Sequence, residues 1–354
     1  MPANIGKSKI LPIFAGLLTL TARLGAVLKP GKPGIGGREM ISIFYRTNGK
    51  LMVSQSEAEL KNLNLNDVVW IDLFAPESAE KRASEAFLGV EIQSRATAEE
   101  IESSSRFKET DTAIFANTNF LMPGPEEYSM EPVSFTLVGG VITTLRDVPL
   151  RSFTELQRRM MAMPHLYPNG YWVFASILDQ RIDLDADMIE LMSKEIAQYS
   201  KRINQQEDIN EEFLLDINQL QENTMTVREN IVDKQRLITN LTKSDKFPAE
   251  LDARFNVLQQ DISSLINHTN FSFERLEYLQ DTVVGLINLE QNKIMKIFTI
   301  ISLLLMPPTL VASFYGMNVE LPGAGFKLAW LAILAFMVLL IVGVIIIFKR
   351  RKMM

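Results

Sequence analysis

The sequence contains no cysteine and only two histidines, His165 and His268. The lack of cysteine excludes disulfide bonds, zinc sites built on thiolates and cysteine nucleophiles. Neither histidine has a second soft ligand at the spacing of a metal site, so we expect both to be structural. The sequence also lacks the Gly-x-x-x-x-Gly-Lys-Ser/Thr motif and any nucleophile, base and orienting group at interpretable spacing. We therefore expect neither an enzyme nor a nucleotide-binding protein, and no cofactor.

Charge is distributed unevenly along the chain. Residues 1–39 hold six basic and one acidic residue, residues 40–291 hold 23 basic and 40 acidic residues, and residues 292–354 hold seven basic residues and one acidic residue. An acidic body of this size repels the phosphates of nucleic acids and attracts cations. We therefore expect no nucleic-acid partner, whereas the basic flanks are typical of segments beside a lipid bilayer.

Two long uncharged segments stand near the C-terminal end. Residues 297–315 and 328–348 contain 19 and 21 residues without a charge, and a helix needs about 20 residues to cross the hydrocarbon core of a membrane. Lys293 and Lys296 precede the first segment and four basic residues, 349–352, follow the second, while the loop between the segments holds one base and one acid. By the positive-inside rule this pattern predicts a multi-pass protein of the cytoplasmic (inner) membrane with both termini cytoplasmic.

The region before the spans divides into two predicted parts. Residues 40–148 alternate short β-rich runs with helical stretches at 77–88 and 97–106, which is typical of a small α/β cytoplasmic domain. The β-rich runs are 41–45, 68–73, 133–137 and 141–145. Residues 149–291 form a predicted stalk of long helices, followed by the two-helix transmembrane domain at 292–354. The predicted fold class is therefore an α+β cytoplasmic domain followed by long stalk helices and two transmembrane α-helices.

One stalk helix is expected to continue into the membrane. It starts near Pro248 and meets no further proline until Pro307, so nothing in the sequence interrupts it between the cytosol and the first span. Residues 1–39 are harder to interpret. Their apolar stretch 10–22 imitates a signal peptide, but export would carry the acidic domain outward, against the charges at the spans. We interpret them as a poorly ordered basic leader or an upstream extension.

Residues at steps of four and three form a polar stripe that starts in the stalk and continues through the first span. Such an average spacing of 3.5 residues keeps one face of a helix directed at the axis of a left-handed bundle. A second face of the same helix is wholly aliphatic. The polar stripe consists of Asp281, Gly285, Asn288, Asn292, Met295, Thr299, Ser302, Met306, Thr309 and Ser313.

Polar side chains inside a span must face protein or water, because an unpaired polar group in hydrocarbon costs several kcal/mol. Hydrogen bonds across a tight helix interface would explain the hydroxyl groups alone. The continuation of the stripe to Asn288 and Asp281, and its end near Asn318, favours an aqueous path. A chain with two spans cannot enclose such a path, so a pore requires several copies around an axis.

The segment Tyr315-Gly-Met-Asn318, between Met306-Pro-Pro-Thr-Leu-Val-Ala312 and a second span with a basic tail, resembles the CorA family of magnesium transport proteins. The resemblance extends back through residues 288–298 and more loosely through 69–73 and 99–107. It covers about residues 40–354 and leaves the leader unexplained.

The resemblance implies a funnel-shaped homopentamer in the bilayer, with the first span around the pore. It implies that Gly316, Met317 and Asn318 form the outer selectivity filter, with Asn318 supplying a ring of amide oxygens. It also implies a hydrophobic gate at Met295 and Phe298. The pore-lining candidates are Asp281, Asn288, Asn292, Thr299, Ser302, Met306, Thr309 and Ser313.

Magnesium is the implied substrate and the implied regulatory ligand. Mg²⁺ loses its water reluctantly, so amide oxygens that bond to its hydration shell would suit rapid passage. In the family's terms, cytosolic Mg²⁺ would bridge acidic groups of neighbouring subunits and hold the pore closed. Candidate regulatory ligands are Asp183, Asp185 and Asp187, with the acidic group at 207–212 as another, although charged clusters on helices are usually solvated faces.

Two kinds of alternative stay open. The outer loop 319–327 is short and carries Glu320 as its only acid, so Co²⁺, Ni²⁺ or Zn²⁺ could be the substrate on the same fold. A zinc-transporting relative normally has another residue in place of Met317. From a different class of protein, the chain could be a membrane-anchored coiled-coil scaffold that conducts no ions.

Overall fold

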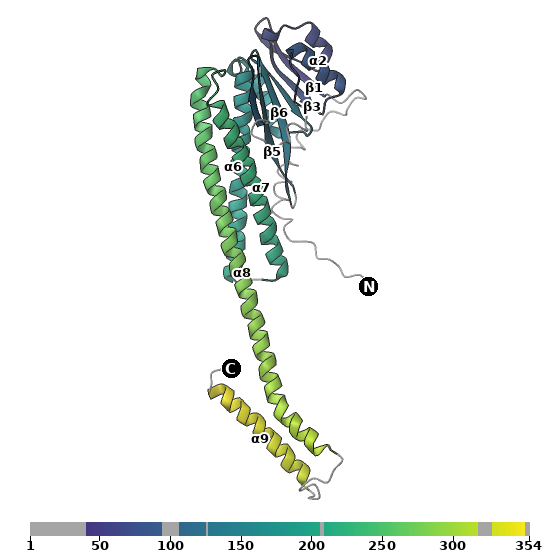
Figure 1. The fold of residues 1–354 in the computed structure, drawn as a ribbon, viewed down its shortest axis with the longest axis vertical. Coiled ribbons are helices and arrows are strands. Elements are labelled where there is room, and N and C mark those ends of the chain that lie inside the picture. The colour runs from purple at the N-terminus through teal and green to yellow at the C-terminus, as the bar shows by residue number, and fades with distance from the viewer. Residues whose placement is uncertain (1–39, 94–105, 125–126, 206–208, 318–327, 351–354) are drawn as a thin grey trace. The chain divides into compact units, whose positions relative to one another are not determined.

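The computed structural model describes residues 40–93, 106–124, 127–205, 209–317 and 328–350 (Figure 1). Contacts divide the chain into two compact units. The first unit comprises Met1–Lys201 and Leu215–Glu277, and the second comprises Arg202–Leu214 and Tyr278–Met354. We describe each unit by itself.

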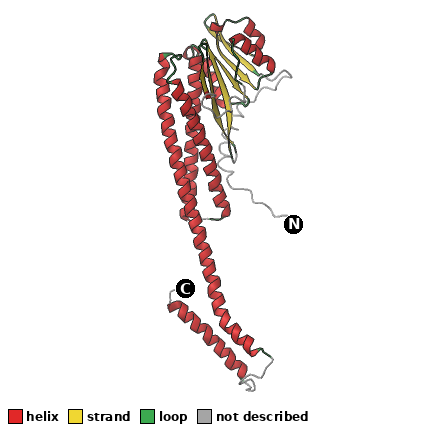
Figure 2. Cartoon of the chain, viewed as in Figure 1, coloured by secondary structure: helices red, strands yellow, loops and turns green. Residues whose placement is uncertain are grey.

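The first unit contains one seven-stranded sheet, drawn in yellow in Figure 2. Its strand order is β2-β1-β3-β7-β6-β5-β4, and every neighbouring pair is antiparallel except β3 and β7. Hairpin turns at Asn48-Gly49 and Gly139-Gly140 have positive φ angles at both central residues, as two-residue hairpins require. The strands are β1 (Ile41–Thr47), β2 (Lys50–Ser54), β3 (Val68–Phe74), β4 (Phe107–Glu109), β5 (Ala113–Pro123), β6 (Tyr128–Val138) and β7 (Val141–Arg146).

Helix α2 (Ser78–Leu88) lies between β3 and β4 in the chain, and the other described α-helices follow the last strand. Helix α2 starts with a capping box between Glu77 and Glu80 and ends at Gly89, whose φ is 70°. From Arg151 onward every described element is helical. These elements are α5 (Arg151–Ala162), α6 (Gly170–Gln205), α7 (Glu211–Leu241), α8 (Asp252–Tyr315) and α9 (Ala329–Arg350), with short 3-10 helices at Glu57–Lys61, Leu65–Asp67, Pro164–Leu166 and Ala249–Leu251.

The two faces of the sheet bury different side chains because residues alternate along a strand. Ile43 and Ile71 belong to an aliphatic cluster that includes Leu88 of α2. On the other face, the Trp70 ring stacks on Phe44 with a centroid distance of 5.0 Å, and it lies 5.8 Å from Phe153 of α5. The sheet is therefore covered on both sides, which explains why β3 is buried along almost its whole length.

A buried ionic network joins β5, α6 and α7. Asp185 is fully buried; its Oδ1 atom accepts a 2.9 Å hydrogen bond from Arg181 Nε, and its Oδ2 atom lies 3.3 Å from Lys234 Nζ. Lys234 Nζ also donates a 2.7 Å hydrogen bond to the Asn119 carbonyl of β5. Asn230 donates to Asp185 and accepts from Lys234. The network satisfies two cations around one carboxylate and so fixes the helices against the sheet.

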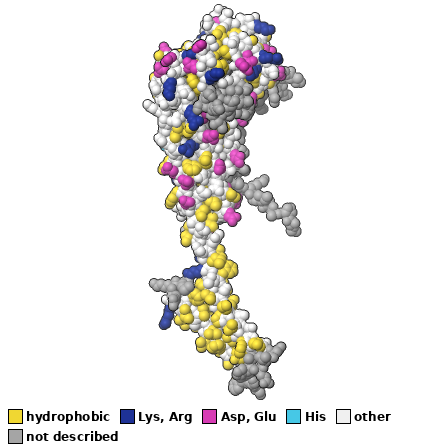
Figure 3. All heavy atoms as spheres, in the orientation of Figure 1, with side chains coloured by type: hydrophobic (Ala, Val, Ile, Leu, Met, Phe, Trp, Pro, Cys, Tyr) yellow, Lys and Arg dark blue, Asp and Glu magenta, His cyan; other side chains and the backbone are white. Residues whose placement is uncertain are grey.

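The second unit contains α8 from Tyr278 onward, all of α9, and the adjoining ends of α6 and α7. Helices α8 and α9 are both long and apolar enough to cross a membrane, and hydrophobic side chains cover this part of the chain in Figure 3. Helix α8 continues as one helix of 64 residues through Pro307 and Pro308 to Tyr315. Prolines are tolerated inside membrane helices because neighbouring groups and local adjustments satisfy the freed carbonyls.

Most elements expected from the sequence are present. The four predicted β-rich runs lie in β1, β3, β6 and β7, the helix at 77–88 is α2, and the continuous helix from the stalk into the first span is α8. Strands β2, β4 and β5 were not predicted. The helix expected at 97–106 and the leader at 1–39 lie outside the described residues, apart from Arg106.

The buried network generates a stability prediction. Replacement Asp185→Ala leaves two buried cations without their carboxylate, and breaking a buried pair in this way costs about 3–5 kcal/mol. We expect a matching loss in the unfolding free energy of the detergent-solubilised protein, measured by urea denaturation. The control Asp183→Ala removes an exposed aspartate from the same helix, where a change within about 0.5 kcal/mol is expected. Equal effects at the two positions would contradict the network.

The same network predicts a pH dependence. Burial lowers the pKa of Lys234 from 10.5 to about 8, although Asp185 opposes the shift. Between these values the unfolded chain binds more protons at this residue, so the free energy of unfolding rises with pH by at most about 1.4 kcal/mol per unit. The contribution is complete above the unfolded pKa and is lost as pH falls through 8. Urea denaturation from pH 7 to 10 should show this rise, and Lys234→Met should remove it.

Candidate pore-lining surface

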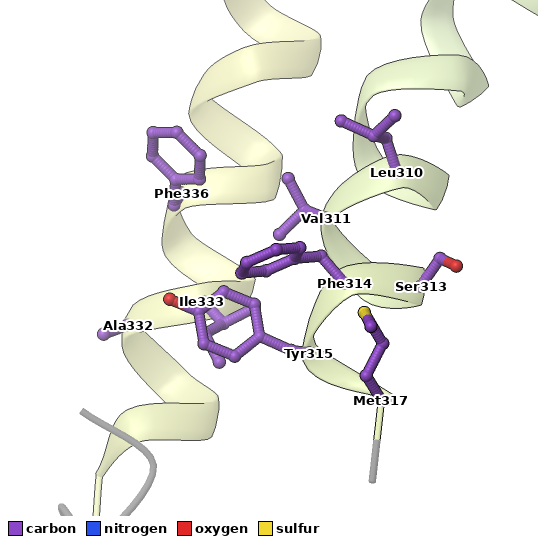
Figure 4. Close-up of a pocket in the computed structure, with 9 residues that line it drawn as sticks. All are labelled: Leu310, Val311, Ser313, Phe314, Tyr315, Met317, Ala332, Ile333 and Phe336. Carbon is purple, nitrogen blue, oxygen red and sulfur yellow. The ribbon is translucent and has the colours of Figure 1, made fainter. Parts of the chain in front are cut away.

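Within the second unit, one side of α8 lies against α9. The half-buried residues of α8 in the span are Ile300, Leu304, Pro307, Pro308 and Val311, whereas nearly all others are exposed. Their spacing of three and four residues places them on one face. In Figure 4, Val311, Phe314 and Tyr315 lie on the side of α8 nearer to Ala332, Ile333 and Phe336 of α9, and these six residues line the same pocket.

The polar stripe lies on the opposite side of α8. Thr299, Ser302, Met306, Thr309 and Ser313 are all exposed in the single chain. At 100° per residue, the centre of this set lies about 160° from the centre of the half-buried face. In Figure 4 the Ser313 hydroxyl points away from α9. Ser313 nevertheless lines the same pocket as the α9 residues, so it borders the face that α9 covers. The other four residues are not part of that pocket, and the second span of the chain leaves them uncovered.

Two hydroxyl groups of the stripe donate their protons within the helix. Thr299 Oγ1 donates to the Met295 carbonyl at 2.8 Å, and Thr309 Oγ1 donates to the Leu305 carbonyl at 2.7 Å. A hydroxyl oxygen has two acceptor lone pairs in addition to its one donor. Because the donor is used inside the helix, each oxygen offers only acceptors to its surroundings. These oxygens are therefore complementary to hydrogen-bond donors, such as the protons of water.

The two gate candidates are large and exposed. Met295 and Phe298 have exposed fractions of 63% and 62%. Met295 lies at the centre of the stripe, whereas Phe298 lies about 60° from that centre. Phe298 therefore borders the stripe, and Met306, at 69% exposed, is a further apolar side chain on it. The assignment of a hydrophobic gate to Met295 and Phe298 stays a prediction.

The helix ends where the Gly-Met-Asn motif begins. The Gly316 N–H donates to the Ala312 carbonyl at 3.0 Å, and a Cβ atom at Gly316 would approach that oxygen to 3.2 Å. Glycine thus allows the backbone to close against the last turn. Met317 is exposed, and Asn318 lies outside the described residues. The filter assignment therefore stays a prediction for all three.

The end of the stripe that lies before the span is also exposed. Asp281, Asn288 and Asn292 present their side chains to solvent in the single chain, and all belong to the second unit together with the span. The stripe changes along α8 from a carboxylate through amides to hydroxyls. The stripe thus offers oxygen ligands of decreasing charge from the stalk into the membrane.

The structure separates the three aspartates of the regulatory hypothesis. Asp183 and Asp187 are exposed, but Asp185 is buried in the ionic network. Residues two apart on a helix face opposite directions, so Asp185 cannot join the other two, and we correct the candidate set to Asp183 and Asp187. Among the described residues, no group of three or more His, Asp or Glu residues is placed to hold a metal ion.

An acidic neighbourhood around Asp183 was not predicted. Burial raises the pKa of Asp179, an effect opposed by its ion pair with Arg254 and reinforced by the charges of Asp183 and Asp261. Asp179 and Asp183 are four residues apart, so the spacing alone could have revealed their proximity. Of the other acidic group, residues 207 and 208 lie outside the described residues, while Glu211 and Glu212 are exposed.

A mixed sheet, long helices and two candidate C-terminal spans, the first of which carries a polar stripe, are the features of a membrane protein. The family model described as CorA-like Mg²⁺ transporter protein matches residues 66–350. The chain belongs to this family.

Individual proteins agree with this assignment. The magnesium transport protein CorA of Wolinella succinogenes is 31% identical over 319 residues, and that of Escherichia coli K12 is 30% identical over 317 residues. Each alignment covers 88% of this chain and 99% of the relative. The structure of the CorA magnesium transporter of Methanocaldococcus jannaschii matches with a TM-score of 0.72 at 16% identity, covering 88% of this chain and 98% of that one. This similarity supports the predicted fold class.

The natural absence of cysteine allows a direct test of the stripe. We expect the thiol of Ser302→Cys to react with a charged, water-soluble thiol reagent in membrane vesicles at least about tenfold faster than that of Leu304→Cys, because the thiolate forms in water. Leu304 is the matched control, since it lies on the half-buried face of the same turn. Equally slow labelling at both positions would show that water does not reach the stripe.

Proposed function

We propose that this chain forms a homopentameric channel that mediates Mg²⁺ uptake across the inner membrane, with both termini cytoplasmic. The observation that carries the proposal is the uncovered stripe of oxygen-bearing side chains on α8, on the side opposite α9. Family membership supports the same function, since the relatives are named magnesium transport proteins.

The physical argument rests on hydration. Mg²⁺ keeps its water shell, whose protons point outward, so the ion is best guided by acceptors that do not replace its waters. Thr299 and Thr309 supply acceptor oxygens because their protons are already donated within the helix. In a pentamer each would form a ring of acceptors. Asn318 would supply the outermost ring and Asn288 and Asn292 the innermost amide rings.

The electrical driving force is sufficient without an energy-consuming domain. At an inside-negative potential of about 100 mV, a divalent ion gains about 4.6 kcal/mol on entry. This corresponds to more than a thousandfold accumulation at equilibrium. A pore with this driving force requires closure, and in the proposal Met295 and Phe298 close it by excluding water.

Closure would depend on cytosolic Mg²⁺. Residues 40–291 carry 17 more acidic than basic residues, so subunits around an axis repel one another unless cations neutralise them. Asp183 and Asp187 are exposed and free of the buried network, and they lie on the same face of α6. Bound Mg²⁺ at such carboxylates would favour the closed population, and its loss would favour the open one.

The proposal is tested by ion flux into liposomes that contain the purified protein. We expect Asn318→Ala to reduce Mg²⁺ influx by at least about tenfold, whereas Asn256→Ala, an exposed asparagine of α8 outside the stripe, should leave it unchanged. A membrane-anchored scaffold would show no flux in either protein.

The same liposomes test selectivity and feedback. Competition by Co²⁺, Ni²⁺ and Zn²⁺ ranks these ions against Mg²⁺. Faster flux of one of them at equal concentration would reassign the substrate. Loading the liposomes with Mg²⁺ on the side of the soluble domain should suppress influx, and flux that ignores internal Mg²⁺ would contradict the regulatory part of the proposal.

A further inference from the structure

Four basic side chains gather on the two membrane helices of the second unit. Lys293 and Lys296 precede the apolar part of α8, and Lys349 and Arg350 end α9. All four are exposed, and none takes part in an ion pair between described residues. Residues 291–317 and 328–350 contain no acidic residue. We call these four residues the basic cluster.

The four cations belong to one level of the membrane. Helices α8 and α9 are antiparallel, and Val311 and Ile333 line the same pocket. From that contact, α8 runs back 15 residues to Lys296 and α9 runs forward 16 residues to Lys349. At 1.5 Å per residue both charges lie about 23 Å from the shared level. This distance places them at the inner boundary of the hydrocarbon core.

The lysines of α8 also face the side on which α9 lies. At 100° per residue, Lys293 points in nearly the same direction as the half-buried residues of the span, and Lys296 deviates from them by about 60°. Lys293 is therefore about 160° away from the polar stripe. Four like charges at one level repel one another across a medium of low dielectric constant. An anion between the helices would relieve this repulsion.

We propose that the basic cluster binds the phosphate headgroup of an anionic phospholipid of the inner leaflet. Charge complementarity and the position at the hydrocarbon boundary favour a lipid, because basic residues beside a span attract anionic headgroups and the exposed apolar surface of α9 can receive the acyl chains. Arg350 can hold a phosphate through two parallel hydrogen bonds, while the lysines act as point charges. The lipid would hold the inner ends of α8 and α9 together. This inference rests on the two spans and not on the transported ion.

The test uses the full-length protein in detergent with added dioleoyl phosphatidylglycerol, and phosphatidylcholine as the neutral comparison. Binding is measured by native mass spectrometry and by the shift in thermal unfolding. One variant replaces the whole basic cluster by glutamine, as Lys293→Gln, Lys296→Gln, Lys349→Gln and Arg350→Gln. Its affinity for phosphatidylglycerol should fall on the order of a hundredfold. The control variant makes the same change of charge on four exposed residues of the first unit, namely Lys50→Gln, Lys61→Gln, Lys194→Gln and Lys201→Gln. It should keep wild-type affinity for phosphatidylglycerol.

Three outcomes would overturn the inference. These are equal affinity of the variant and control for phosphatidylglycerol, equal binding of phosphatidylcholine by the wild type, and binding of inorganic phosphate as tight as that of the lipid. If the glutamine variant is misfolded, a charge-preserving variant tests the inference instead, namely Lys293→Arg, Lys296→Arg, Lys349→Arg and Arg350→Lys. It should bind phosphatidylglycerol like the wild type, and its failure to do so would also refute a charge-based site.

Discussion

The structure depends on one constraint, namely that polar groups within hydrocarbon need a partner. Helix α8 carries hydroxyl groups through its span on the side that α9 leaves uncovered. Two of these hydroxyls donate inward to carbonyls of their own helix, which satisfies their protons but leaves their acceptor lone pairs exposed. Lipid offers no donor to these oxygens. In the proposed pentamer, water along the axis would supply these donors. The same proposal explains why the stripe continues into the stalk at Asn288 and Asp281.

A buried ionic network stabilises the first unit, in which the same helix begins. A buried carboxylate, Asp185, is held by Arg181 and Lys234, and Lys234 in turn contacts a strand carbonyl. Such a network costs desolvation energy and contributes mainly by allowing one arrangement of helices and sheet. Helix α8 starts in this unit and reaches the span without interruption. In the proposed regulation by cytosolic cations, this continuous helix would link the contacts between copies of the first unit to the span.

The sequence predicted the features that local patterns encode. Apolar length defines both spans, and the spacing of prolines indicates the continuity of α8. Strand β5 was missed because Asn117 and Thr118 break its apolar pattern; the Thr118 hydroxyl is bonded to Asp233, which is 115 residues away. Asp185 was misjudged for a related reason, since its partner Lys234 is distant in sequence, although the two-residue spacing already placed it opposite Asp183 and Asp187. The position of the polar stripe could be read from the sequence, but its exposure could not, because exposure depends on which face of α8 the second span covers.

The placement of the basic residues is consistent with passage of a cation along the stripe. A lysine directed at a shared axis would be repeated in every copy, and a ring of such charges a few ångströms from a divalent ion would oppose its entry into the cytosol by several kcal/mol at an intermediate dielectric constant. Lys293 instead points about 160° away from the stripe, while the stripe positions at the same level, Asn292 and Met295, are uncharged. Beyond a separation of about 8 Å, physiological salt screens the remaining repulsion. In the proposed pentamer the two faces of α8 would divide the electrostatic roles. The uncharged oxygen acceptors of the span would face the axis, and the lysines would face α9 and the lipid headgroups.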